Sequence, residues 1–155
     1  LLCVHREKVR DMESMNKENK TAKAKQLHSQ GFNCSQSVVM TFAEDLGLKS
    51  ELAERMSAAF GGGVAKMGEI CGCVSAMAVL SGFVKENQTI EGKVDKMKAM
   101  AWTKDLAEKF RNECGDIVCR QLKAPEATTG RTPKPCRELV GIAARLIAEK
   151  LSAED

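Results

Sequence analysis

The stretch Ile70–Val84, ICGCVSAMAVLSGFV, decides how we expect this chain to fold. It is apolar on nearly every side, rich in small residues, and preceded by three consecutive glycines at 61–63. A helix without a polar face is buried among other elements, and small side chains let neighbouring backbones come close. The stretch therefore predicts a buried helix at the centre of a helical bundle.

Amphipathic segments lie on both sides of this stretch, and Gly or a capping residue marks many of their ends. No segment shows the period-two alternation that indicates a strand. The prediction is an all-α fold, a single-domain bundle of five or six helices around the buried small-residue helix. Besides that helix we expect helices at 20–30 after Asn19, at 35–46, after Ser50 to about 60, at 90–113, and from 135 or 136 onward, with a short helical turn at 117–122.

Helical spacing also predicts which side chains face the core, because residues three and four apart share one face. The inward-facing set is Val38, Val39, Phe42 and Leu46; Leu52, Met56, Ala59 and Phe60; Val94, Met97, Ala101, Leu106 and Phe110; and Leu139, Ile142, Ala143, Leu146 and Leu151.

Length and composition fit one globular domain. The chain has 155 residues, of which 43% are hydrophobic and 29% charged, and this is the balance of a folded protein. Residues 1–18 are polar, so we expect a tail or frayed helix there and the folded domain at 19–155. The first residues lack the apolar stretch of a signal peptide, which favours a cytoplasmic protein.

Charge and hydropathy exclude two classes of partner. The 24 basic and 21 acidic residues are interspersed, giving a net charge of +3. A nucleic-acid surface needs a basic stripe with aromatic residues for stacking, and the chain has neither. No apolar run reaches the length of a membrane-spanning helix. We therefore expect no nucleic-acid partner and no membrane insertion.

Seven cysteines are an unusually high number for a chain of 155 residues. The count is odd and no secretory signal is visible, so metal binding or redox chemistry explains them better than a disulfide framework. Four stand where helices are expected to begin, and the partial positive charge of a helix N-terminus stabilises a thiolate. If these starts converge, they form an electropositive pocket for sulfur. The four are Cys34, Cys71, Cys119 and Cys136.

The wide gaps between the four cysteines match neither zinc ribbons nor compact ferredoxin runs. A free cysteine is also among the most buried residue types and packs as a small hydrophobe. Core packing is therefore an equal explanation for each of the four when it is taken separately.

The sequence resembles the C_GCAxxG_C_C family, described as redox-active proteins with four separated cysteines and a CGAxxG motif around the second. The likeness spans about 22–147 and lies in four segments: GFNCSQSV with Cys34, FGGGVAKMGEICGCVSA with Cys71, GDIVCRQL with Cys119 and KPCRELV with Cys136. It implies redox activity through these four cysteines without naming a cofactor. The chain departs from the motif at Cys73, which replaces Ala, and at Ala76, which replaces the closing Gly.

The remaining cysteines have weaker claims to a role. On a helix, Cys73 would point about 200° away from Cys71, so we expect it to pack in the core; in a loop it would supplement or replace Cys71. Cys114 is either a resolving thiol for Cys119 or, preferably, a partly exposed residue at a helix end. Cys3 lies in the tail and is expected to be a bystander.

Two polar residues, His28 and Glu69, lie near the cysteines in the sequence and are candidate partners of the thiols. His28 is expected near a helix end, as a solvated residue rather than the partner of Cys34. Glu69 is expected to be a surface carboxylate rather than an acid or base. The glycine-rich loop before Cys71 lacks the Lys and Ser or Thr of a nucleotide-binding loop. Its backbone N–H groups would instead approach a cluster or ligand.

Three functions follow from these patterns. The first is electron transfer by an iron–sulfur cluster bound to Cys34, Cys71, Cys119 and Cys136, because four thiolates are the usual ligand set. The second is a metal-free thiol–disulfide redox protein, and the third a structural zinc site on the same thiolates. No carboxylate pair or catalytic triad shows whether the chain is an oxidoreductase or an electron carrier. A redox partner protein and a homo-oligomer sharing a cluster are both compatible with the cysteine spacing.

Overall fold

A computed structural model describes residues 2–154, and side chains within 12–153. The side chain of Cys3 lies outside the described residues. Helix makes up 68% of the chain and the described residues contain no strand, which confirms the all-α prediction. The helices are α1 (Leu2–Ser29), α2 (Cys34–Phe42), α3 (Ser50–Ser57), α4 (Gly72–Ser81), α5 (Lys96–Cys114), α6 (Cys119–Lys123), α7 (Glu126–Thr129) and α8 (Cys136–Glu154), with single 3-10 turns at Ala58–Phe60 and Lys85–Asn87.

The eight α-helices of the described residues exceed the five or six predicted. The additional elements are α6, which corresponds to the predicted short helical turn at 117–122, and α7, which has only 4 residues and is too short to show a hydrophobic period of 3.6. Helix α1 also begins at Leu2 instead of after Asn19. The predicted cap at Asn19 is wrong because residues 2–18 contain no Gly or Pro that would stop a helix.

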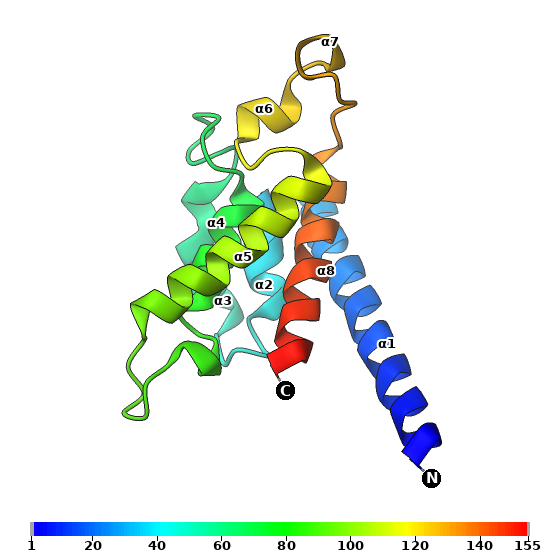
Figure 1. The fold of residues 1–155 in the computed structure, drawn as a ribbon. Coiled ribbons are helices and arrows are strands. Elements are labelled where there is room, and N and C mark those ends of the chain that lie inside the picture. Colours follow the sequence, from blue (N-terminus) through cyan, green and yellow to red (C-terminus); the bar gives the residue numbers. More distant parts are fainter. Residues whose placement is uncertain (1, 155) are drawn as a thin grey trace.

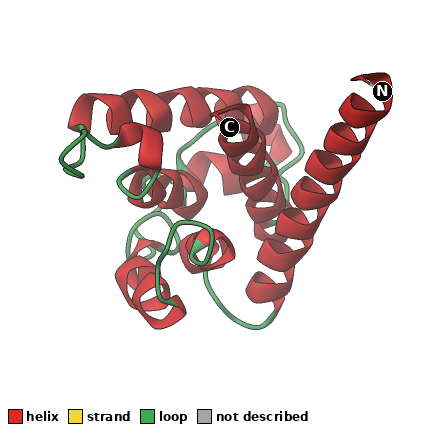
Figure 2. Cartoon of the chain, turned by 90° about the horizontal axis from the view of Figure 1, so that it is seen from below, coloured by secondary structure: helices red, strands yellow, loops and turns green. Residues whose placement is uncertain are grey.

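The core lies where α2, α4, α5 and α8 meet. Helix α4 packs against the other three, and its Cys73, Ala76, Met77 and Leu80 are fully buried. Helix α1 packs along α8, and its N-terminal half extends away from the rest of the bundle (Figures 1 and 2). The small-residue stretch is therefore a buried helix, as predicted, although it begins only at Gly72.

The first turns of α2 and α4 approach each other at Gly72. A Cβ placed on Gly72 would lie 3.0 Å from the backbone nitrogen of Ser35, 3.1 Å from Cβ of Cys34 and 3.2 Å from the carbonyl oxygen of Phe60. Two of these atoms are backbone, so they cannot move aside as the end of a side chain can. A Cβ here would force these atoms apart by a few tenths of an ångström, so Gly72 permits the close approach that sets α4 beside Cys34.

Two helix faces differ from the prediction. In α3 the buried residues are Ala53 and Ser57, whereas Leu52 is 50% exposed. Near α5, Val94, Met97 and Ala101 are exposed instead of inward, while Leu106 and Phe110 are buried as expected.

The error at α5 arises from its start. The Asp95 carboxylate accepts hydrogen bonds from the backbone N–H groups of Met97 and Lys98, at 3.0 and 3.2 Å, and so begins the helix. Residues 90–95 form a loop with a left-handed turn at Gly92. Because that segment is not helical, Val94 does not share the inward face of α5.

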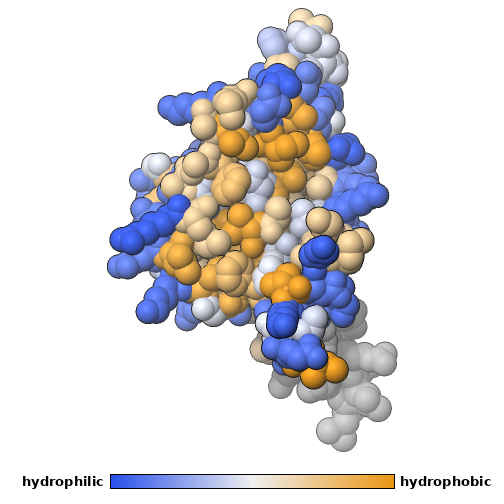
Figure 3. All heavy atoms as spheres, turned by 90° about the vertical axis from the view of Figure 1, so that its left-hand side faces the viewer, coloured by the Kyte–Doolittle hydropathy of each residue, from blue (hydrophilic) through white to orange (hydrophobic). Residues whose placement is uncertain are grey.

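One face of the molecule gathers apolar side chains at its surface (Figure 3). Exposed apolar residues of α5 and the loop before it include Ile90, Val94, Met97 and Met100. A shallow cavity of about 520 Å³ lies between α4 and α5, lined by residues such as Val79 and Met100. Within the described chain, no helix combines the length and apolar character needed to cross a membrane.

We predict that Gly72→Ala lowers the free energy of unfolding by about 1–3 kcal/mol, since the added methyl group overpacks the contact between α2 and α4. Gly82→Ala is the matched control, because nothing lies within 4 Å of its Cβ position and its φ is −72°. It should change stability by less than about 1 kcal/mol. Urea unfolding of both variants measures the difference. Equal stability of the two variants would show that the approach at Gly72 is not tight.

Candidate functional site

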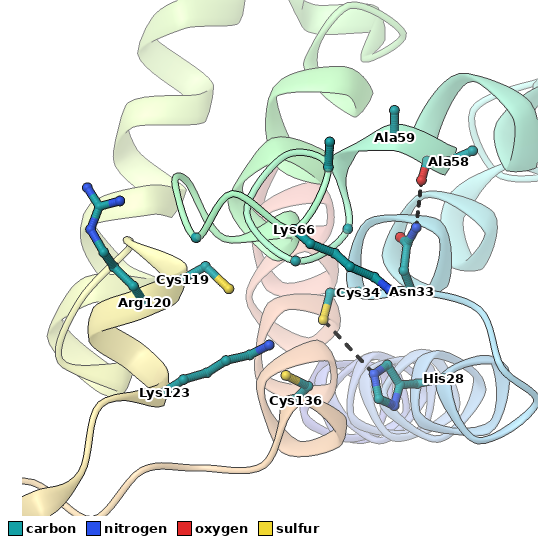
Figure 4. Close-up of a pocket in the computed structure, with 14 residues that line it drawn as sticks. His28, Asn33, Cys34, Ala58, Ala59, Lys66, Cys119, Arg120, Lys123 and Cys136 are labelled. Carbon is teal, nitrogen blue, oxygen red and sulfur yellow. Dashed lines mark hydrogen bonds between the residues drawn. The ribbon is translucent and has the colours of Figure 1, made fainter.

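The four predicted cysteines all stand at helix starts. Cys34, Cys119 and Cys136 are the first residues of α2, α6 and α8, and Cys71 directly precedes α4. The first three line one cleft of about 730 Å³, and their sulfur atoms point into it from three different helices (Figure 4). Cys71 does not line this cleft and is only 3% exposed. Helix packing therefore gathers residues that are far apart in the sequence.

Asn33 fixes the position of Cys34. Its side-chain oxygen accepts from the backbone N–H of Gln36 at 3.0 Å, and the Gln36 side chain accepts from the backbone N–H of Asn33 at 3.1 Å. This capping box satisfies N–H groups that a helix start leaves unpaired. The Asn33 amide also donates to the carbonyl of Ala58 at 2.8 Å, which ties the start of α2 to the segment after α3.

The glycine-rich loop forms one wall of the cleft through an unusual backbone. Residues 62–66 all have positive φ, including the non-glycine residues Val64, Ala65 and Lys66. Such residues are strained and rarely occur in succession. The backbone N–H groups of residues 64–69 donate to carbonyls of residues 59–64 at 2.7–3.3 Å. These N–H groups hold the loop together, so the expectation that they approach a ligand is wrong for residues 64–69.

Backbone hydrogen bonds also fix the positions of α6 and Cys71 relative to the glycine-rich loop. The backbone N–H of Cys119 donates to the carbonyl of Glu69 at 2.6 Å, and that of Cys71 donates to the carbonyl of Ile117 at 2.8 Å. Gly63 is required here, since its φ is +72° and a Cβ would lie 2.6 Å from Cβ of Cys119. Cys71 and Cys119 are thus placed on neighbouring, paired segments.

Glu69 is an exposed carboxylate, in agreement with the prediction of a surface role. It forms a bidentate ion pair with Arg120, with oxygen–nitrogen distances of 2.8 and 3.3 Å. The Arg120 guanidinium lowers the pKa of Glu69. This pair joins the loop to α6 at the rim of the cleft.

Cys34 is the most acidic thiol of the group. The pKa of Cys34 is lowered to about 3. The largest cause is a hydrogen bond from the Cys136 thiol to the Cys34 sulfur, and the next is one from the Cys73 thiol. His28 Nε2 lies 4.0 Å from Cys34 Sγ and favours the thiolate further, as Figure 4 shows. Burial opposes these effects without cancelling them. The turn at Gly31 brings His28 and Cys34 together, although His28 was expected to be solvated rather than the partner of Cys34.

Cys73 packs in the core, as expected, and is fully buried. Its thiol also lies within hydrogen-bonding reach of the Cys34 and Cys71 sulfurs, and these interactions together with burial raise the pKa of Cys73. Cys71 and Cys73 would point apart only if both lay within a helix. Cys71 instead has φ −53° and ψ 134°, outside the helix, so its sulfur can meet that of Cys73.

The thiolate-stabilising effect of a helix start is not shared by all four cysteines. The pKa of Cys71 is lowered, chiefly by the Cys73 thiol and further by N–H groups at the start of α4. The pKa of Cys119 is raised by burial, and that of Cys136 is raised because its proton is held by the Cys34 sulfur. Convergence of four thiolates is unfavourable because like charges repel in a partly buried site.

Cys114 lies at the end of α5, as expected, but it is buried at 9% exposure rather than partly exposed. Burial, with a contribution from the Glu113 carboxylate, raises the pKa of this thiol to about 12. It is a structural residue in this arrangement, because a protonated and buried thiol is a poor nucleophile.

Metal ligation has no support from the side-chain geometry. Among the residues that the structure describes, no group of three or more His, Cys, Asp or Glu side chains is arranged to hold a metal ion. The four thiols have the donor chemistry of an iron–sulfur or zinc site, but they do not form a coordination sphere. Binding of either metal by Cys34, Cys71, Cys119 and Cys136 stays a prediction.

Two cationic side chains of the cleft were missed by the sequence analysis. Lys66, on the left-handed loop, and Lys123, at the end of α6, both line the cleft. Neither lies in a pattern that distinguishes it from the other lysines, so only the tertiary arrangement identifies them.

Comparison with known proteins gives one match. A family described as "Putative redox-active protein (C_GCAxxG_C_C)" matches residues 32–150. No curated protein and no solved structure matches the chain. The matched segment contains every cysteine of the cleft, together with Cys71 and Cys73.

We predict that Cys34 is alkylated by iodoacetamide at a rate that changes little between about pH 8 and about pH 5, since its lowered pKa keeps it a thiolate. A thiol of ordinary pKa would slow about tenfold for each pH unit. Mass spectrometry of the alkylated peptides follows each cysteine separately. Cys114 is the internal control and should remain unmodified in the folded protein.

The Cys136→Ala and Cys136→Ser variants test the cause of this acidity. Alanine removes the donor, so the rate profile of Cys34 should move to higher pH, whereas serine keeps an O–H donor and should move it less. Identical profiles for wild type and both variants would contradict the assigned hydrogen bond.

Proposed function

We propose that this chain, which belongs to the C_GCAxxG_C_C family, is a thiol–disulfide redox protein with Cys34 as nucleophile and Cys136 as its partner. The observation that carries the proposal is that Cys34 and Cys136 line the wall of one open cleft, where the Cys136 thiol is the largest cause of the lowered pKa of Cys34. A stabilised thiolate beside a second thiol is the arrangement used for disulfide exchange.

The reaction takes two steps and balances without a metal. The Cys34 thiolate attacks one sulfur of a substrate disulfide, forms a mixed disulfide and releases the other sulfur as a thiolate, which takes a proton from solvent. Cys136 then loses its proton and attacks Cys34 Sγ. This step releases the second substrate thiol and leaves a Cys34–Cys136 disulfide, so two protein thiols are oxidised and one substrate disulfide is reduced. A dithiol reductant restores the protein by the same exchange.

Cys136 suits the resolving role better than Cys73. Both thiols donate to Cys34, but Cys73 is fully buried in α4, whereas Cys136 is half-buried and lines the cleft with Cys34. Deprotonation of Cys136 in the second step becomes easier once Cys34 is no longer an anion, because the charge that raises the pKa of Cys136 has then been removed.

A metal centre on Cys34, Cys71, Cys119 and Cys136 is the competing proposal. It is favoured by the four helix starts that meet at one end of the bundle, and by the lowered pKa of both Cys34 and Cys71. An iron–sulfur cluster would make the protein an electron carrier, while zinc would stabilise the fold. It requires the four side chains to move into a common coordination sphere.

Oxidation with a mild disulfide should produce one intramolecular Cys34–Cys136 bond, detected by peptide mapping as a loss of two hydrogen atoms. Cys34→Ser and Cys136→Ser should each abolish it while thermal unfolding remains cooperative. Cys114→Ser is the matched control and should leave the disulfide intact. The result that defeats the proposal is a brown protein with bound iron and sulfide after anaerobic purification, or a stoichiometric zinc content that is lost in Cys71→Ser.

A further inference from the structure

The cleft around Cys34 carries an unbalanced positive charge. Its described lining residues include three basic side chains and His28, but no Asp or Glu. Arg120 is neutralised by its bidentate pair with Glu69. No ion pair is found for Lys66 or Lys123 in the described part of the chain. Two cations therefore remain available to a ligand.

These two lysines reach the cleft that holds the Cys34 sulfur from different segments of the chain. Figure 4 shows Lys66 extending from the glycine-rich loop towards Cys34 and Asn33, and Lys123 extending from α6 towards the cysteines. Lys123 is close enough to oppose the rise in the pKa of both Cys119 and Cys136. An anion bound between the lysines would therefore lie next to Cys34.

The position of Lys66 depends on its strained backbone. It is the last of five consecutive residues with positive φ, at +62°. Its N–H donates to the carbonyl of Gly61 at 3.1 Å, which fixes the turn that presents the side chain to the cleft. Strain of this kind persists only where surrounding contacts enforce it and is common at ligand-binding sites.

The size and walls of the cleft fit a small molecule. Its volume of about 730 Å³ lies within the range of pockets that bind small ligands. Ala58, Ala59 and Ala65 give it apolar walls beside the thiols. A compact ligand with an aliphatic or aromatic body and peripheral negative charges would match these surfaces.

We propose that the cleft binds a low-molecular-weight disulfide bearing carboxylates, with Lys66 and Lys123 pairing with the carboxylates while Cys34 attacks the disulfide. This inference rests on the proposed function, because it names the substrate class of the same reaction. The bonds made and broken are those of the exchange described above, and the carboxylates keep their charge throughout. The lysines are positioning residues, since they offset the repulsion between an anionic substrate and the Cys34 thiolate.

The test compares two disulfide probes of opposite character, the dianionic dithiobis(nitrobenzoate) and the neutral dithiodipyridine. Stopped-flow absorbance gives the rate of each with the full-length protein, and peptide mapping assigns the fast phase to Cys34. Lys66→Gln and Lys123→Gln should each slow the anionic probe about two- to fivefold, the scale of an exposed ion pair. The neutral probe should change less than about twofold, and high salt should slow only the anionic probe in wild type.

Lys98→Gln is the matched control, because Lys98 is exposed on α5 and is not part of the cleft. The substrate inference is overturned if the cleft variants slow both probes equally, or if Lys98→Gln slows the anionic probe as much as they do. Cys34→Ser separates the two proposals. If it removes the fast phase while the lysine variants have no effect, only the substrate class is wrong; if the fast phase survives, the proposed function itself fails.

Discussion

The site depends on the close contact between the first turns of α2 and α4 at Gly72. That contact sets Cys34, the first residue of α2, beside Cys73 in the first turn of α4, while Cys71 precedes the same turn. The paired segments around Glu69 and Cys119 then add α6, and packing of α8 on α2 and α4 adds Cys136. Backbone hydrogen bonds to the glycine-rich loop place Cys119, and helix packing places the other sulfurs, so the chemistry of the site depends on both the core and this loop.

A cluster of close thiols cannot hold a negative charge on every member, because like charges repel in a partly buried site. The negative charge of this thiol cluster is concentrated on Cys34, the sulfur that accepts from the most donors. Cys34 receives hydrogen bonds from Cys136 and Cys73 and faces His28, so its pKa falls while those of its two thiol donors rise. A reactive thiolate whose two thiol donors stay protonated is suited to exchange chemistry, in which a neighbouring thiol later serves as nucleophile.

Local patterns predicted much of the fold and part of the site. The buried helix, the apolar inward residues of α2, part of the inward face of α8 and the four cysteines at helix starts were predicted, whereas the fully buried Val140, Ala144 and Ile147 of α8 were not. These features depend on hydrophobic period and capping, which act over a few residues. The buried faces of α3 and α5 were not predicted correctly. Leu52, Val94 and Met97 are apolar, but the helix starts and the neighbouring elements leave them at the surface. Periodicity identifies an apolar face but not what covers it.

The sequence by itself determined the helical class, the family and the candidate cysteines, since composition, spacing and capping are local properties of the chain. Only the tertiary structure decided which thiol is acidic. The pKa of Cys34 depends on donors from α4 and α8 and on a histidine at the end of α1, none of which is adjacent to it in sequence. It also decided that Lys66 and Lys123 share the cleft with Cys34. Electrostatic interactions fall off with distance in space, and only the folded chain sets those distances.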